Sequence, residues 1–186
     1  MEKLKEKYKK ETIPAMMKRF GYKNVMAVPA IKKVVINSSF GKNIAGKTSG
    51  ERTKIQNLIM QDLTLIAGQK PKFVKSKKSI AGFKLREGLE IATVVTLRKS
   101  KMWDFLERFI YLSLPRSRDF KGIDPKSIDK RGNLNMGFKE HISFPEIFAE
   151  KEKTIFGLEI TIATNAKSKE EGLELYKLLG FPIKEK

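Results

Sequence analysis

The stretch IATVVTLRKSKMWDFLERFI, residues 91–110, places a strand directly before a helix and so decides the class of fold. Over 91–97 the residues alternate between two sets, and this period of two is typical of a half-buried β-strand. The apolar residues that follow have the i, i+3, i+4, i+7, i+8 spacing of a core-facing helix: Met102, Phe105, Leu106, Phe109 and Ile110. We expect this helix to end before Pro115, because proline cannot continue the hydrogen-bond ladder.

The same two periods predict the other elements of the chain. Further strands are predicted at 31–40, 72–75 and 156–162, and further helices at 3–20, from Thr48 or Ser49 to Gly68, and from Ser168 to Gly180. Pro14 lies inside the first helix and should kink it. Together these elements predict an α+β fold, with about four strands in a mostly antiparallel sheet, helices packed on one face and the other face open.

The length of 186 residues is enough for one compact domain with a substantial core. We expect residues 1–186 to form a single domain. Residues 116–145 are poor in apolar groups, so they are predicted to be a long loop excursion with a short hairpin near 134–138.

The composition points to a polyanionic partner. Lys and Arg number 39 against 21 Asp and Glu, which leaves a net charge of +18. Such an excess repels itself unless a polyanion neutralises it, so nucleic acid is the first candidate. The absence of cysteine excludes disulfides, thiolate metal sites and cysteine nucleophiles. No run is apolar enough for a membrane span and no export signal is visible, so we expect a cytoplasmic protein with no membrane partner.

Residues 41–48 read GKNIAGKT and match the phosphate-binding P-loop pattern. The alternative function is therefore a nucleotide-binding protein, in which backbone amides around Gly41 and Gly46 cradle phosphates, Lys47 contacts the outer phosphates and Thr48 binds Mg²⁺. Two features argue against it: no predicted strand ends in an acid that could hold the metal, and the preceding strand is half-exposed rather than buried on both faces. We interpret the match as accidental.

Other enzymatic sites have little support in the sequence. His141 is the only histidine, so a metal cluster or a Ser-His-Asp arrangement would depend on one loop residue. We expect His141 to be structural or solvent-facing. The predicted protein is not an enzyme and has no catalytic residues, metal site or cofactor.

The positive charge is concentrated in segments. Residues 69–86, QKPKFVKSKKSIAGFKLR, hold seven cations and no acid, with Phe73 and Phe83 between them. Such a segment can neutralise a phosphate backbone and offer aromatic rings for stacking with an unpaired base.

Strand register predicts a second basic surface. Lys33 and Asn37 alternate away from the apolar set of their strand, and Thr96 and Arg98 do the same on theirs. Both polar rows would lie on the open face of the sheet, where cations hold phosphates and Asn or Thr bonds to sugars or base edges.

Seven stretches of the chain, in order, resemble the ribosomal protein L5 family of the large subunit. They are VVIN (34–37), LIAGQKP (65–71), KSKKSIAGFKLREG (75–88), VTLR (95–98), LPRSRDFKG (114–122), RGNLNMGFKEHISFPEI (131–147) and the tail 157–181. The resemblance implies an α+β protein of the central protuberance that attaches 5S rRNA to the large subunit through the open face of its sheet. The chain departs from the family pattern after VVIN, where Ser38–Gly41 and a longer segment to Ser49 create the P-loop match, and at 89–92.

The resemblance also implies residue roles. Asn37, Gln69 and Thr96 match the RNA-contacting Asn, Gln and Thr of the family motifs, and the basic residues Lys33 and Arg98 would support them. The loop with KKSIAGFKLR resembles the family's finger toward the elbow of P-site tRNA, which implicates Lys77, Lys78, Ser79, Gly82, Phe83 and Lys84. The 116–145 excursion resembles the region that meets small-subunit head protein thirteen across an intersubunit bridge. The other implied partners are 23S rRNA and neighbouring large-subunit proteins.

Overall fold

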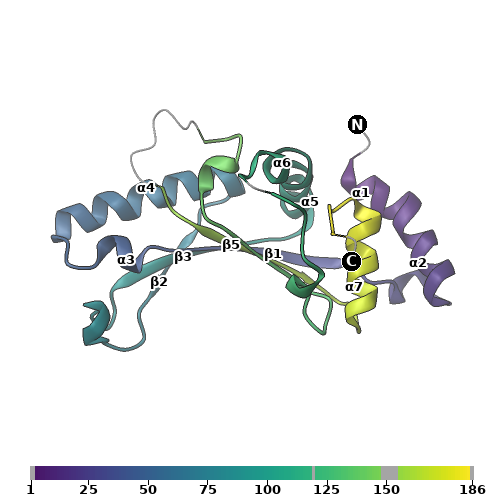
Figure 1. Cartoon of the computed structure of the whole chain (residues 1–186), viewed down its shortest axis with the longest axis horizontal. Helices are drawn as coiled ribbons and strands as arrows, with labels where there is room; N and C mark the ends of the chain where they lie inside the picture. The colour runs from purple at the N-terminus through teal and green to yellow at the C-terminus, as the bar shows by residue number, and fades with distance from the viewer. Residues whose placement is uncertain (1–2, 119, 148–154, 185–186) are drawn as a thin grey trace. The chain divides into compact units, whose positions relative to one another are not determined.

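The computed structural model describes residues 3–118, 120–147 and 155–184 (Figure 1). The chain separates into two compact units. The first unit comprises Met1–Val34, Arg98–Met136 and Thr161–Lys186, and the second unit comprises Val35–Leu97 and Gly137–Ile160.

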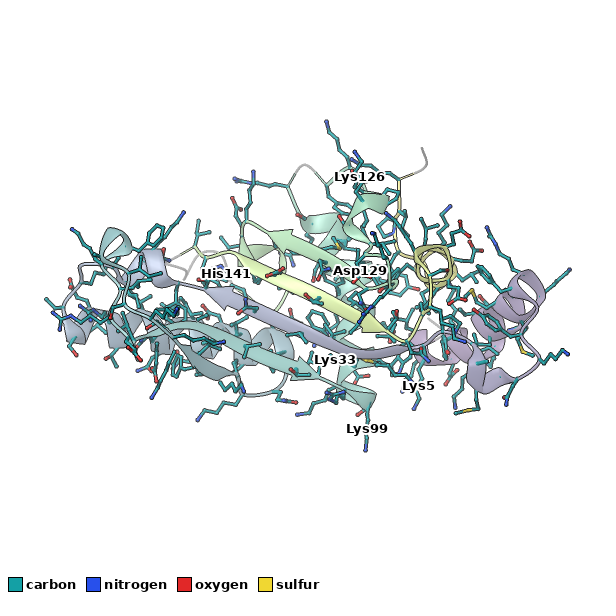
Figure 2. All side chains as sticks on the ribbon, turned by 90° about the horizontal axis from the view of Figure 1, so that it is seen from below. Lys5, Lys33, Lys99, Lys126, Asp129 and His141 are labelled. Carbon is teal, nitrogen blue, oxygen red and sulfur yellow. The ribbon has the colours of Figure 1, made fainter. Side chains whose placement is uncertain are left out.

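Five strands form an antiparallel sheet in the order β2-β3-β1-β5-β4 (Figure 2). Their bounds are Ile31–Ser39 for β1, Lys72–Lys75 for β2, Glu90–Leu97 for β3, Leu134–Phe138 for β4 and Leu158–Thr164 for β5. The α+β prediction is confirmed. The sheet has five strands rather than about four, because the segment predicted as a short hairpin, 134–138, lies at the sheet edge as β4 and pairs with β5.

The strands alternate between buried and half-buried residues, as their period of two predicts. On β1, Val34 and Ile36 are fully buried, whereas Lys33, Val35 and Asn37 are only half-buried. β3 follows the same rule over residues 93–97, since Thr93, Val95 and Leu97 are buried and Val94 and Thr96 are half-buried. A sheet covered on one face produces this alternation, because successive side chains point to opposite faces.

In the second unit the covering helix is α4, Ser49–Ala67, which packs against β3. Its apolar stripe is fully buried at Ile59, Leu63 and Ile66. The helix has the predicted bounds because both ends carry local signals. Thr48 and Glu51 form a capping box, and the C-cap Gly68 adopts a left-handed φ of 62°.

The N-terminal helix of the first unit contains a π-helical turn before Pro14. It consists of α1 Leu4–Lys7, the π-helical η1 Tyr8–Thr12 and α2 Ile13–Phe20. In η1 the N–H of Ile13 donates to the carbonyl of Tyr8, five residues back. Pro14 has no N–H and its ring clashes with the carbonyl four residues before it, so a wider turn accommodates it within the helix.

The same arrangement corrects the prediction for the helix after β3. This helix does not end before Pro115 but continues as α5 Lys99–Arg108, the π-helical η4 Phe109–Ser113 and α6 Leu114–Arg116. The N–H of Leu114 donates to the carbonyl of Phe109, which gives Pro115 the same wide turn that precedes Pro14. The missing N–H and the ring of Pro115 are thereby accommodated within the continuous helix.

The C-terminal helix of the first unit, α7 Lys169–Leu179, lies against the turn around Gly132. Ser168 caps it by accepting a hydrogen bond from the N–H of Glu171, as predicted, and Gly180 ends it with φ 92°. A Cβ added to Gly172 would lie 2.8 Å from the carbonyl oxygen of Gly132, so two glycine backbones meet here. The buried Tyr176 hydroxyl donates toward the carbonyls of Gly132 and Ile162, at 3.1 and 3.2 Å, and burial raises its pKa above the ordinary value.

Buried apolar residues and backbone hydrogen bonds attach the part of the 116–145 excursion that lies in the first unit to the rest of that unit at several points. Ile123 and Ile128 are buried, and the N–H of Ile123 donates to the carbonyl of Pro182 at 2.7 Å. Short 3₁₀ turns occur at η5 Pro125–Ser127 and η6 His141–Ser143, on either side of β4. Few but well-placed apolar residues therefore anchor this segment.

Candidate nucleic-acid interface

Three of the predicted RNA-contacting side chains belong to the second unit. Asn37 lies on β1 between the buried Ile36 and Ser38, so its side chain points to the opposite, uncovered face. Thr96 occupies the equivalent place on β3, between the buried Val95 and Leu97. The uncovered face therefore presents a carboxamide and a hydroxyl on two neighbouring strands.

The third residue, Gln69, comes from a different element and is brought to β3 by the end of α4. It follows the C-cap Gly68, and its Nε2 donates to the backbone carbonyl of Thr96 at 3.4 Å. This bond engages the carbonyl of Thr96 and not its hydroxyl. The structure thus places the Gln69 amide beside Thr96. The alternation of residues along the strands did not predict this contact.

The two predicted cations, Lys33 and Arg98, belong to the first unit. Lys33 lies on β1 (Figure 2) and is half-buried. By the period of two it shares a face of that strand with Asn37, four residues along. Arg98 is exposed at the end of β3, where its extended backbone forms the N-cap of α5. The next residue, Lys99, has a left-handed φ of 53°, which turns the chain from strand to helix.

The loop between β2 and β3, residues 76–89, carries the other predicted site. Backbone and side-chain hydrogen bonds hold its base, since Ser76 Oγ donates to the carbonyl of Arg86 at 2.5 Å and Ser76 N–H to that of Leu89 at 2.8 Å. Nearer the tip, Ile80 and Leu85 form an antiparallel bridge around the 3₁₀ turn η3, Ala81–Phe83. Short local bonds therefore give this loop a defined shape.

All six implicated loop residues are exposed: Lys77, Lys78, Ser79, Gly82, Phe83 and Lys84. The seven cations of residues 69–86 are exposed as well. Of the two phenylalanines expected to stack with bases, Phe83 is 63% exposed. Phe73 is half-buried, and its ring packs edge-to-face on Phe40 at 6.4 Å between centroids, so it is less accessible than Phe83.

The P-loop-like segment does not have the geometry of a phosphate cradle. Residues Gly41–Ile44 form the short helix α3, in which the amides of Asn43 and Ile44 donate to the carbonyl of Phe40. Thr48, which would have to bind Mg²⁺, donates its hydroxyl to Glu51 Oε2 at 2.8 Å. The hydrogen bonds from the backbone and side chain of Thr48 lower the pKa of Glu51. These groups are used for helix formation and capping, which agrees with the interpretation of an accidental match.

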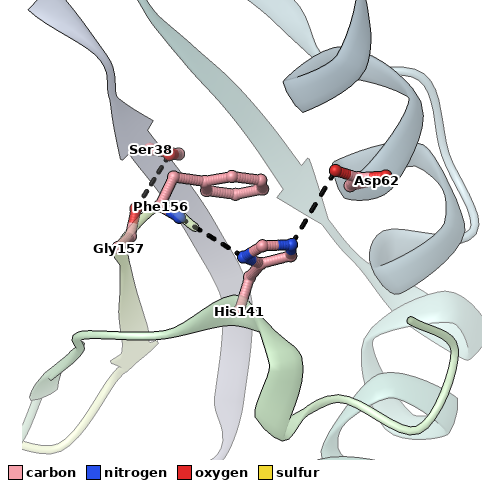
Figure 3. Close-up of polar contacts among 5 residues, drawn as sticks. All are labelled: Ser38, Asp62, His141, Phe156 and Gly157. Carbon is pink, nitrogen blue, oxygen red and sulfur yellow. Dashed lines mark hydrogen bonds and ion pairs between the residues drawn. The ribbon is translucent and has the colours of Figure 1, made fainter. Parts of the chain in front are cut away.

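His141 is structural and fully buried, so it is not solvent-facing (Figure 3). Its ring stacks on Phe156 at 3.9 Å between centroids, and its Nδ1 accepts the N–H of Phe156 at 3.4 Å. Its Nε2 faces the carboxylate of Asp62 on α4, 3.9 Å from Oδ2. Asp62 was not predicted to take part in this buried cluster. Its position in the sequence does indicate burial, because a charged residue three positions after Ile59 falls on the apolar stripe of α4.

Neither a metal site nor a membrane-spanning helix is found in the part of the chain that the structure describes. No group of three or more potential metal ligands is found in residues 3–118, 120–147 and 155–184. Within those ranges no helix combines the length and the apolar character that crossing a bilayer requires.

Comparison with known proteins finds matches along nearly the whole chain. Residues 24–86 match the family model described as Ribosomal protein L5, and residues 90–183 match the model that describes the C-terminus of the same ribosomal family. The chain is 50% identical over 184 residues to the large ribosomal subunit protein uL5 of Geotalea daltonii, covering 99% of each chain. It is 46% identical over 183 residues to that of Halothermothrix orenii, covering 98% of this chain and 99% of the relative. It is 50% identical over 186 residues to that of Colwellia psychrerythraea, covering 100% of this chain and 99% of the relative.

Proposed function

Because this chain belongs to the ribosomal protein L5 family, and is a structural protein of the large ribosomal subunit rather than an enzyme, we propose that it binds 5S rRNA and attaches it to the large subunit in the central protuberance. The observation that carries the proposal is the uncovered face of the sheet, where Asn37, Thr96 and the adjacent Gln69 present polar groups. Carboxamides and hydroxyls can bond to ribose 2′-OH groups and base edges.

Binding combines two kinds of contact with different roles. Lys33 and Arg98 neutralise phosphates, which supplies affinity for any RNA and makes the affinity depend on salt. Asn37, Gln69 and Thr96 set the register and select the RNA, because bonds to base edges and sugars depend on shape and sequence.

The other contacts of the proposed function follow from the exposed segments. The β2–β3 loop, with its exposed Lys77, Lys78, Phe83 and Lys84, contacts P-site tRNA in this proposal. The 116–145 excursion contacts small-subunit head protein thirteen across an intersubunit bridge. The partners of the chain are rRNA and ribosomal proteins. Besides 5S rRNA, they include 23S rRNA and neighbouring large-subunit proteins in this proposal.

A competition between two RNAs tests the proposal. The purified chain is titrated with 5S rRNA and with an unrelated RNA of equal length over a series of salt concentrations. We expect 5S rRNA to bind more tightly throughout, and the difference to persist at high salt, where the purely electrostatic part is weakest. Equal affinities across the whole series would overturn the proposal in favour of a general polyanion binder.

The nucleotide-binding alternative has its own test. The proposal expects no measurable ATP binding by the wild-type chain, because the amides of residues 43–45 and 47 and the hydroxyl of Thr48 are engaged within the protein. ATP binding that disappears in Lys47→Ala would support the alternative instead.

A further inference from the structure

We propose that a pocket between α3 and the tip of the β2–β3 loop binds one unpaired nucleotide of an RNA strand, with the base against Phe83 and the phosphate between Lys42 and Lys84. The inference rests on the proposed function in taking RNA as the ligand, and it adds a site away from the uncovered sheet face. Both walls of the pocket belong to the second unit.

The pocket has the size of a small-ligand site. Its volume is about 390 Å³, and its lining includes the apolar residues Ala45, Leu85 and Ile91. Volumes of roughly 300–1,000 Å³ with a mainly apolar lining are typical of pockets that bury small organic ligands. A nucleobase is a flat ligand of this class.

The lining also supplies the two other groups that a nucleotide needs. Phe83 is 63% exposed, an unusual degree for a phenylalanine, and it is one of the residues that line the pocket. Lys42 on α3 and Lys84 on the loop also line it, and there is no carboxylate among the described residues of its lining. An aromatic ring beside two cations is the combination by which single-stranded RNA is held, since every base has a π face and every nucleotide a phosphate.

The backbone at Lys84 gives independent support. Lys84 adopts a left-handed φ of 50° as the C-cap of η3, with its N–H donating to the carbonyl of Ala81. Glycine is the residue that fits this conformation without strain. A lysine in this conformation is a strained residue, and strained residues cluster at functional sites.

The other wall of the pocket distinguishes this chain from the family pattern. Lys42 and Ala45 lie within the Ser38–Ser49 stretch that departs from the L5 motif order, and this stretch folds into α3. The site therefore includes residues that the family resemblance assigned no role.

The test uses the full chain and a short RNA hairpin with one 2-aminopurine in its unpaired loop, compared with a fully paired duplex of the same length at one salt concentration. We expect the wild type to quench the 2-aminopurine fluorescence and to prefer the hairpin. Phe83→Ala should weaken hairpin binding about fivefold or more, the loss expected for one base stack, and leave duplex binding unchanged. Phe83→Trp should retain it.

Matched controls separate the pocket from the loop as a whole. Ile80 is exposed in the same loop but does not line the pocket, so Ile80→Ala should not affect hairpin preference. Lys42→Ala should reduce that preference, whereas Lys78→Ala should weaken hairpin and duplex equally. Lys84→Gly is the most discriminating variant, because it should relieve backbone strain, leaving the thermal midpoint unchanged or higher, and still weaken hairpin binding.

Three results would overturn the inference. The first is an unchanged hairpin affinity in Phe83→Ala, with circular dichroism showing the variant folded. The second is free AMP binding as tightly as the hairpin, which would assign the pocket to a mononucleotide. The third is displacement of the hairpin from the pocket by an acidic peptide at equal concentration. Binding of 5S rRNA is measured in parallel, because the inference can fail while 5S rRNA binding, and with it the proposed function, stands.

Discussion

Replacing Gly172 by alanine sets two effects of opposite sign against each other. Gly172 lies inside the helix α7, where alanine is favoured over glycine by about 1 kcal/mol of helix propensity. A Cβ at this position, however, would lie 2.8 Å from the carbonyl oxygen and 3.0 Å from the carbonyl carbon of Gly132. These are backbone atoms that cannot rotate away, so the cost belongs in the upper half of the roughly 1–3 kcal/mol typical of overpacking.

The net expectation for Gly172→Ala is therefore a destabilisation of about 1–2 kcal/mol. The measurement is urea unfolding followed by circular dichroism, in which the midpoint should fall without a change in slope. On heating, the midpoint should fall by about 2–8 °C for a chain of this size.

Gly50→Ala is the matched control for this prediction. Gly50 lies in the first turn of α4, and no atom lies within 4 Å of the Cβ that alanine would add. The same exchange should be neutral there or stabilise by up to about 1 kcal/mol. An equal gain in stability at both positions would refute the close approach of α7 to Gly132.

Four other predictions concern RNA binding and pH. Asn37→Ala or Thr96→Ala should weaken 5S rRNA binding by about 1–3 kcal/mol with little change in its salt dependence, and a matching loss with unrelated RNA would contradict their selective role. Lys33→Ala should instead weaken all RNAs alike and lower the slope of log affinity against log salt by about one, so an unchanged slope would remove Lys33 from the phosphate contacts. Truncating residues 76–84 should spare 5S rRNA affinity but change tRNA protection in assembled ribosomes, and loss of 5S rRNA binding would contradict this division. Burial alone would raise the pKa of Asp129, but hydrogen bonds from the 131–133 turn hold that pKa below its ordinary value. The stability that Asp129 contributes should therefore be complete above about pH 4 and decline as pH falls through the lowered pKa. An effect of Asp129→Ala on urea unfolding that does not change with pH would refute this prediction.

Much of the fold could be predicted because its signals are local. The helix α4 begins after Thr48 and ends at Gly68 as predicted, since a capping box and a left-handed glycine act within four residues of the helix ends. The alternation on β1 and β3 likewise predicted that Asn37 and Thr96 lie away from the buried set. Of the site, these two residues could be placed from the sequence, together with the exposed loop.

The differences from the predictions have two origins, one in local backbone geometry and one in packing between distant segments. Pro115 was expected to end a helix, but a π-helical turn before it lets the helix continue. Phe73 was expected to be available for stacking, but it is half-buried, with its ring packed edge-to-face on Phe40, thirty-three positions earlier. The first outcome depends on a choice between an α and a π turn that apolar periodicity does not distinguish, and the second depends on which distant segment packs against Phe73.

By itself the sequence determined the class of fold, the ends of most helices, the polar row on the sheet and, through its motif order, the family. The tertiary structure alone decided that Gln69 lies beside Thr96, that His141 is buried against Phe156 and Asp62, and that α3 and the β2–β3 loop form a pocket. The physical reason is the separation along the chain over which each kind of interaction acts. Periodicity and capping depend on backbone geometry over a few residues, whereas a side chain's partners depend on which distant segments the buried core brings together.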